Sequence, residues 1–240
     1  MLIHQTAEKL RQMKLHGMAE LLLNQQSQTA AGELCFEERL GLLVDYEWTH
    51  RQNKRLARLL KKAKLKLEAC LEDINYQHPR NLDQAVMAHL SSCQWLLTGQ
   101  NVLISGPTGV GKTYIACALA NMACRQGFSA RYYRLSRLLM ELNSCRADGS
   151  LPKFMNQLAK IDLLLIDDWG LAPLNSEESR DFLDIIDDRV SARSTIVAGQ
   201  LPVEHWHELM HDPTVADAVL DRLFHHAHKL KLTGDSMRKT

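Results

Sequence analysis

The sequence predicts an α/β protein in which a parallel sheet flanked by helices follows a small all-helical domain. Two observations carry this prediction. From residue 101 onward, short apolar runs of strand length alternate with amphipathic stretches of helical period, as they do in the strand–helix units of parallel sheets. Residues 1–70 show helical periodicity alone, so we expect a helical domain over 1–70 and an α/β domain over 71–240. The five strand candidates are 101–105, 130–135, 161–166, 195–199 and 227–232.

The predicted helical domain carries an excess of positive charge. The 240 residues have a formal net charge of +1, but residues 1–70 hold 12 Lys and Arg against 8 Asp and Glu. An anionic partner should therefore meet this part of the chain first. The N-terminus lacks the apolar core of a signal peptide, no apolar run reaches the length of a membrane span, and the six cysteines form no recognisable pairs. These features predict a cytoplasmic protein.

Three helices are expected in the first 70 residues, over 5–26, 36–47 and 49–67. The third contains eight basic residues and no acid between residues 51 and 66, and six of them form one continuous stripe on a helix. Their mutual repulsion favours a polyanion as neutralising partner, so the stripe predicts contacts with the DNA backbone that are largely independent of sequence. A solvated surface helix is the alternative, and Arg134 and Arg146 mark a second candidate DNA surface. The residues of this basic stripe are Arg51, Lys54, Arg55, Arg58, Lys61 and Lys62.

A glycine-rich loop between the first strand candidate and a predicted helix has the pattern GPTGVGKT, the Walker A motif. Its glycines allow successive backbone N–H groups to point at anionic oxygens, and the N-terminus of the following helix adds partial positive charge. Lys112 supplies a full charge for the phosphates, and Thr113 supplies a hydroxyl for Mg²⁺. The residues expected to bind nucleotide are Gly106, Pro107, Thr108, Gly109, Val110, Gly111, Lys112, Thr113 and Tyr114.

The strand candidate 161–166 ends in two adjacent carboxylates, Asp167 and Asp168, which form a Walker B pattern. In open α/β sheets, ligands bind at the carboxyl ends of the strands. Asp167 should hold Mg²⁺ opposite Thr113, and Asp168 should orient or deprotonate the attacking water. The alternative is a capped strand end with both acids solvated.

Taken together, four segments resemble AAA+ ATPases of the DnaC/IstB group. They are GPTGVGKT at 106–113, LLLIDDWG at 163–170, STIVAGQLP at 194–202 and DRLFHHAHKLKLTGDSMRK at 221–239. The residues of the segments 64–76 (KLKLEACLEDINY) and 200–208 (QLPVEHWHE) make the resemblance strongest for the IstB-like transposition helpers. The resemblance covers essentially the whole chain and implies a sheet of order 5-1-4-3-2, a helical N-terminal domain and a C-terminal lid that is reduced or absent.

The resemblance also implies roles for three further residues. Gln200 occupies the sensor I position, although Ala198 and Gly199 before it lack the hydroxyl groups common in relatives. Arg222 occupies the position of an arginine finger, which reaches the γ-phosphate held by a neighbouring subunit; a surface arginine paired with a nearby aspartate is the alternative. Arg238 is a candidate for sensor II.

The function implied is that of an ATPase with ATP and Mg²⁺ as cofactors, which oligomerises on DNA with ATP between subunits. It would assist a partner transposase in target selection or strand transfer for an insertion sequence. Two alternatives stay open: a DnaC-like loader of a replicative helicase, and a DNA-binding scaffold that ATP switches with negligible turnover.

Overall fold

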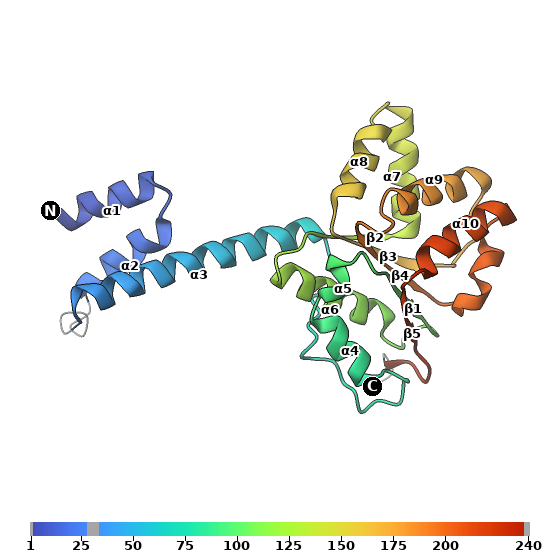
Figure 1. Ribbon diagram of the computed structural model, residues 1–240, viewed down its shortest axis with the longest axis horizontal. Helices are drawn as coiled ribbons and strands as arrows, with labels where there is room; N and C mark the ends of the chain where they lie inside the picture. The colour runs from blue at the N-terminus through green and yellow to red at the C-terminus, as the bar shows by residue number, and fades with distance from the viewer. Residues whose placement is uncertain (1, 28–33, 238–240) are drawn as a thin grey trace. The chain divides into compact units, whose positions relative to one another are not determined.

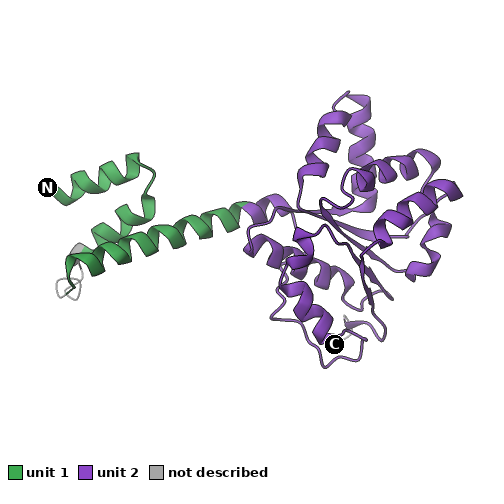
Figure 2. Ribbon diagram, viewed as in Figure 1, with its two compact units in different colours: residues 1–58 green, residues 59–240 purple. Residues whose placement is uncertain are grey.

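The computed structural model describes residues 2–27 and 34–237. The chain divides into two compact units, Met1–Arg58 and Leu59–Thr240 (Figure 2). The sequence placed its domain boundary at residue 70, whereas residues 59–70 belong to the second unit. The reason is local bonding: Arg131 donates to the carbonyl of Lys62, and Lys66 pairs with Asp167.

In the first unit, the predicted helix over 5–26 is two helices, α1 (Leu2–Gln12) and α2 (His16–Ser27). The break lies at Lys14, which adopts a left-handed backbone with φ 61°. The amide of Lys14 donates to the carbonyl of Arg11, and the amide of Leu15 donates to that of Leu10. These two bonds form a Schellman cap, which ends α1 even though lysine occupies the position that glycine usually takes.

The helices predicted over 36–47 and 49–67 are instead one helix, α3 (Phe36–Ala63). Neither glycine nor proline occurs between residues 42 and 63, so nothing interrupts the helical hydrogen bonds near Trp48. The helix ends where Lys64 turns into the left-handed region with φ 50°. All six residues of the basic stripe lie on α3 and are exposed.

The second unit is built on a five-stranded parallel sheet of order β2-β3-β4-β1-β5, which confirms the predicted order read from the other edge (Figure 1). Its central strands are buried on both faces, as parallel strands between two helical layers must be. The strands are β1 (Val102–Ser105), β2 (Ala130–Arg134), β3 (Leu163–Trp169), β4 (Ser194–Gly199) and β5 (His228–Lys231).

Helices cover both faces of this sheet. On one face, α6 (Lys112–Arg125) contacts β1 to β4. On the other, Leu164 and Ile166 of β3 join a core built with α7 to α10. Because side chains alternate along a strand, Asp167 follows onto the α6 face. The remaining elements are α4 (Gln84–Ser91), α5 (Gln94–Leu97), α7 (Leu135–Ala147), α8 (Leu151–Lys160), α9 (Ser176–Asp187), the 3-10 helix η2 (Val203–Leu209) and α10 (Pro213–Phe224).

The described residues after β5, 232–237, contain no further α-helix. Over the described parts of the chain, no helix combines the length and apolar character needed to cross a bilayer.

A buried arginine joins the ends of several elements beneath the sheet. Arg189, only 1% exposed, donates to the carbonyls of Leu158, Ile161 and Ser194 and to the hydroxyl of Thr195. Burial lowers its pKa to about 9, so the guanidinium stays charged at neutral pH. It thereby satisfies three carbonyls where α8 ends and where β3 and β4 begin.

We expect Arg189→Met to lower the free energy of unfolding of the second unit by about 3 kcal/mol or more, because it leaves buried carbonyls without donors. Urea unfolding followed by circular dichroism measures this change. As the control, Arg193→Met removes an ion pair with Asp162 whose side chains are 43% and 28% exposed, and should change stability by about 1 kcal/mol at most. Equal effects of the two substitutions would contradict this role of Arg189.

Candidate nucleotide site

The Walker A loop connects β1 to α6 through a backbone that requires glycine. Gly111 caps α6 with φ 102°, and a Cβ there would lie 2.6 Å from the Arg80 guanidinium. The first amides of α6 have no helical acceptors, so the loop ends in donors that suit an anion. The Lys112 ammonium donates to the carbonyls of Gly106 and Pro107, at 2.6 and 2.8 Å. The Lys112 ammonium and the amides at the start of α6 thus place positive charge inside the loop.

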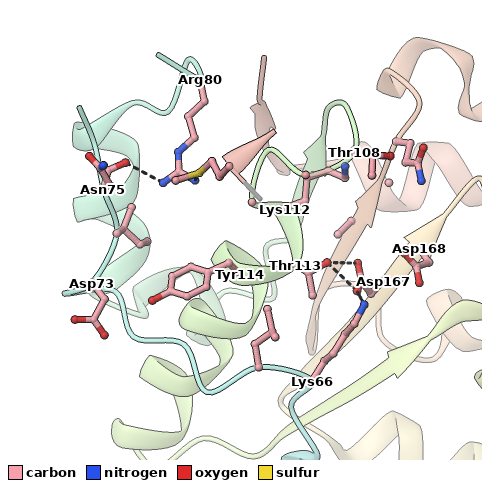
Figure 3. A pocket seen from close by; sticks show the side chains of 18 residues that line it. Lys66, Asp73, Asn75, Arg80, Thr108, Lys112, Thr113, Tyr114, Asp167 and Asp168 are labelled. Atoms are coloured by element: carbon pink, nitrogen blue, oxygen red, sulfur yellow. Dashed lines mark hydrogen bonds and ion pairs between the residues drawn. The ribbon is translucent and has the colours of Figure 1, made fainter. Parts of the chain in front are cut away.

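The Thr113 hydroxyl and the Asp167 carboxylate meet at the base of this loop, as the sequence predicted. The hydroxyl lies 3.1 and 3.0 Å from the two carboxylate oxygens, and Figure 3 shows both side chains pointing toward one another from α6 and β3. Asp167 is 2% exposed. Alternation along β3 explains the meeting, because it turns Asp167 toward the N-terminus of α6.

Two further groups hold the Asp167 carboxylate, and no pattern in the sequence indicated either of them. The Tyr132 hydroxyl donates to Oδ2 at 2.9 Å, and the Lys66 ammonium lies 3.5 Å from the same oxygen. Burial raises the pKa of Tyr132, and the charge of Asp167 raises it further, so the phenol remains a protonated donor. Asp167 is therefore a fixed, buried acceptor.

This donor set suits Mg²⁺. A threonine hydroxyl and a carboxylate are hard oxygen ligands, and Mg²⁺ commonly binds through one or two such groups together with water and substrate phosphates. The described residues contain no group of three or more His, Cys, Asp or Glu side chains that could hold a metal by themselves. Thr113 and Asp167 could therefore supply two of the ligands of a Mg²⁺ ion whose other ligands are water or phosphate oxygens.

Asp168 lies beside this pair in a different backbone conformation. It has φ 62°, within a register irregularity of β3 between Ile166 and Trp169. Its side chain is about one-quarter exposed, and Oδ2 accepts from Arg134 Nε at 2.8 Å. The irregularity separates the directions of the two acids, so that Asp167 is buried and Asp168 remains accessible.

A cavity of about 370 Å³ contains these groups. One end is polar and includes Thr108, Lys112, Thr113 and both acids. The other end lies against Tyr114 and the segment 67–80 (Figure 3). The sequence analysis did not predict that this segment lines the site, although the residues of 64–76 helped to identify the family resemblance. Lys66 lies beside Asp167 at the polar end, and the remaining lining residues on the other side are Leu67, Asp73, Ile74, Asn75, Arg80, Tyr114 and Met237.

Arg80 links the loop to two segments that are distant in sequence. It is 2% exposed and donates to the carbonyls of Val110 and Asn75 and to the sulfur of Met237. Burial lowers its pKa. The amide of Met237 in turn donates to the carbonyl of Gly109 at 3.0 Å. The Walker A loop is consequently covered by one segment that precedes it in the sequence, around Arg80, and by another that follows β5, at Met237.

Of the other predicted site residues, Gln200 lines the cavity and Arg222 does not. Gln200 follows β4, between the strands that carry the two Walker motifs, and lines the cavity. Arg222 on α10 is not among the lining residues; its Nε pairs with Asp187 Oδ1 at 2.5 Å, and its Nη1 donates to the Ala218 carbonyl. Arg238 lies outside the described residues.

The two predicted DNA surfaces also differ. The basic stripe is exposed along α3, although Arg51 additionally pairs with the buried Glu47 at 2.6 Å. Arg134 is paired with Asp168, and Arg146 contacts carboxylates of α9. These internal pairs leave the stripe as the better candidate.

Comparison with known proteins settles the family. Residues 8–240 match the family described as IstB-like ATP binding proteins. The chain belongs to this family. An insertion sequence ATP-binding protein of Sinorhizobium fredii is 44% identical over 239 residues, which cover 100% of this chain and 98% of that protein. The IS1162 ATP-binding protein of Pseudomonas fluorescens is 49% identical over 203 residues, 84% of this chain and 88% of that protein.

Solved structures of replication proteins share the fold of this chain over about 70% of its length. The crystal structure of the DnaC helicase loader matches with a TM-score of 0.59 over 72% of this chain and 100% of that one. A crystal structure of DnaI matches with a TM-score of 0.58 over 70% of this chain and 90% of that one. Identities of 21% and 20% make this a likeness of fold alone.

Proposed function

We propose that this IstB-like protein binds ATP with Mg²⁺ and hydrolyses it, and that this activity supports the transposition of an insertion sequence. The observation that carries the proposal is the contact of the Thr113 hydroxyl with the buried Asp167 carboxylate, in a cavity that also holds Lys112 and Asp168. Relatives of S. fredii and P. fluorescens that carry ATP-binding and insertion sequence in their names support both parts of it.

In the proposed binding step, the Walker A loop and the first amides of α6 hold the phosphates. The Lys112 ammonium exchanges the carbonyls of Gly106 and Pro107 for phosphate oxygens, because a charged acceptor forms the stronger hydrogen bond. Thr113 and Asp167 hold Mg²⁺, which when bound neutralises part of the phosphate charge. The apolar surface of Leu67, Ile74 and Tyr114 receives the base.

In the proposed hydrolytic step, Asp168 accepts a proton from the attacking water or orients it. Its exposure on the cavity side of β3 supports this role over that of a capped strand end. The Arg134 ion pair orients the carboxylate and competes with water for Oδ2. Gln200, at the end of the neighbouring strand, helps to position the water.

We assign Arg222 to the site of a neighbouring subunit. It does not line the cavity of its own chain, and its position near the end of α10 suits a residue that acts in trans. Its pairing with Asp187 holds the guanidinium at the surface of the free subunit. Arg238 is proposed as sensor II of the same site.

Outside the nucleotide site, we propose that the basic stripe binds DNA through its phosphates, that ATP promotes assembly on DNA in the cytoplasm, and that a transposase is the partner. The stripe's charge and exposure support the DNA contact. The insertion sequence relatives favour a transposase over a replicative helicase, since the likeness to DnaC is one of fold alone.

For the nucleotide site, we expect Lys112→Ala to weaken ATP binding and abolish hydrolysis, because it removes the charge on the phosphates. Asp168→Asn should bind ATP but lose turnover, because an amide cannot accept the proton. Fluorescent-nucleotide titration and phosphate release measure the two properties, with Lys153→Ala on the exposed side of α8 as control. Wild-type turnover by Asp168→Asn would assign the water to another residue.

For the shared site, Arg222→Ala should lower turnover by about 10³-fold, which corresponds to about 4 kcal/mol of transition-state stabilisation. Mixing it with Lys112→Ala on DNA should recover hydrolysis, because one protein supplies an intact Walker site and the other an intact arginine. A mixture of Lys112→Ala with Asp168→Asn is the control and should stay inactive. No recovery in the first mixture, with both variants co-assembled, would exclude action in trans.

For the basic stripe, replacing Arg55, Arg58, Lys61 and Lys62 by Ala should weaken DNA binding similarly for all sequences. If each contacts one phosphate, the slope of log affinity against log salt falls by about 4. Fluorescence anisotropy at several salt concentrations measures this slope. A variant with Lys9, Arg11 and Arg180 replaced is the control; equal slopes for wild type and the stripe variant would move the DNA surface elsewhere.

A further inference from the structure

The groups around Asp167 raise a question of charge balance. This carboxylate is almost fully buried, and the hydroxyls of Thr113 and Tyr132 that donate to it are neutral. Among its bonded partners in the described chain, only Lys66 is charged. A buried charge is costly without a partner of opposite sign, and the Lys66 ammonium is the charged partner of this carboxylate.

Lys66 reaches this position because of how α3 ends. The helix stops at Ala63, Lys64 adopts a left-handed backbone, and Arg131 of β2 holds the carbonyl of Lys62 at 3.0 Å. Tyr132, the next residue of β2, holds Asp167 itself. The last turn of α3 is therefore fixed to the same strand that supports the carboxylate.

The Lys66 ammonium also lies where a second cation would have to approach. It lines the cavity together with Thr113 and Asp167, and its side chain is one-third exposed (Figure 3). Two cations close to one carboxylate repel each other at short range. A metal held by Thr113 and Asp167 and the Lys66 ammonium are thus competitors for one carboxylate.

We propose that Lys66 is a positioning residue that acts as a substitute cation for Asp167 in the nucleotide-free protein, and that Mg²⁺ bound with nucleotide displaces it. The proposal rests on the proposed nucleotide function of the same site. In the nucleotide-free state, Lys66 pairs with Asp167 and holds its carboxylate in place. It also raises the Mg²⁺ concentration needed for loading.

Displacement of Lys66 has a consequence for α3. Lys66 follows the last residue of the helix by three positions, and Lys61 and Lys62 of the basic stripe lie in that last turn. Release of the ion pair removes one of the contacts that hold the segment 64–67 against the cavity wall. The nucleotide state is thereby transmitted to the end of the helix that carries the stripe.

The test uses the full-length protein with a fluorescent ATP analogue and a Mg²⁺ titration. We expect Lys66→Met to bind the analogue at a Mg²⁺ concentration about tenfold lower than wild type, because the competing charge is gone. Without nucleotide and Mg²⁺, its melting temperature should fall by about 5 °C or more, because Asp167 loses its cation. With both added, most of this difference should disappear. Lys66→Arg, which keeps the charge, should resemble wild type in each measurement.

Arg125→Met is the matched control, because it removes a nearby ion pair with Glu72 that does not touch Asp167. It should leave the Mg²⁺ titration unchanged. If Lys66→Met does not fold, Lys66→Gln provides the same comparison. The proposal is wrong if Lys66→Met leaves the Mg²⁺ midpoint unchanged and lowers the melting temperature equally with and without Mg²⁺ and nucleotide. Lys66 would then have a structural role only. Absence of Mg²⁺-dependent binding by the wild type would instead overturn the proposed function itself.

Discussion

The contact between Asp167 and Thr113 is the constraint on which the nucleotide site of this IstB-like protein depends. It requires that β3 present a buried carboxylate to the α6 side of the sheet, and that the Walker A loop deliver a hydroxyl to the same point. Strand alternation satisfies the first requirement and the glycine at the start of α6 the second. Burial of the carboxylate then demands further support, which Tyr132 and Lys66 provide.

The two acids at the end of β3 have different surroundings, which suit the two different roles proposed for them. In a regular strand, Asp168 would face the opposite side of the sheet from Asp167. The left-handed backbone at Asp168 changes its direction, and both residues line one cavity. Such a conformation is disfavoured for a residue other than glycine, and strained positions of this kind concentrate at functional sites. The pairing with Arg134 stabilises the result.

Two segments that are distant in sequence from the Walker A loop converge on it and help to line the cavity. The segments 66–80 and 232–237 both pack against the loop. Arg80 bonds at the same time to the loop, to Asn75 of the first segment and to Met237 of the second. A buried cation with three such partners makes the two segments interdependent. The proposed roles of Lys66 and of the α3 stripe extend this dependence from the nucleotide to the end of the helix that carries the positive charge.

The sequence alone determined the elements that local patterns encode. Strand–helix alternation gave the five strands, the glycine spacing gave the loop, and the acids after an apolar run gave Asp167 and Asp168. It misjudged the helices of the first unit, because the cap at Lys14 uses no glycine and nothing near Trp48 interrupts α3. Only the tertiary structure decided which distant groups complete the site: Lys66 meets Asp167 across 101 residues, and Arg80 meets Met237 across 157. The physical reason is that periodicity reports which face of an element is buried, whereas pairing between buried polar groups depends on how the chain returns to the same point in space.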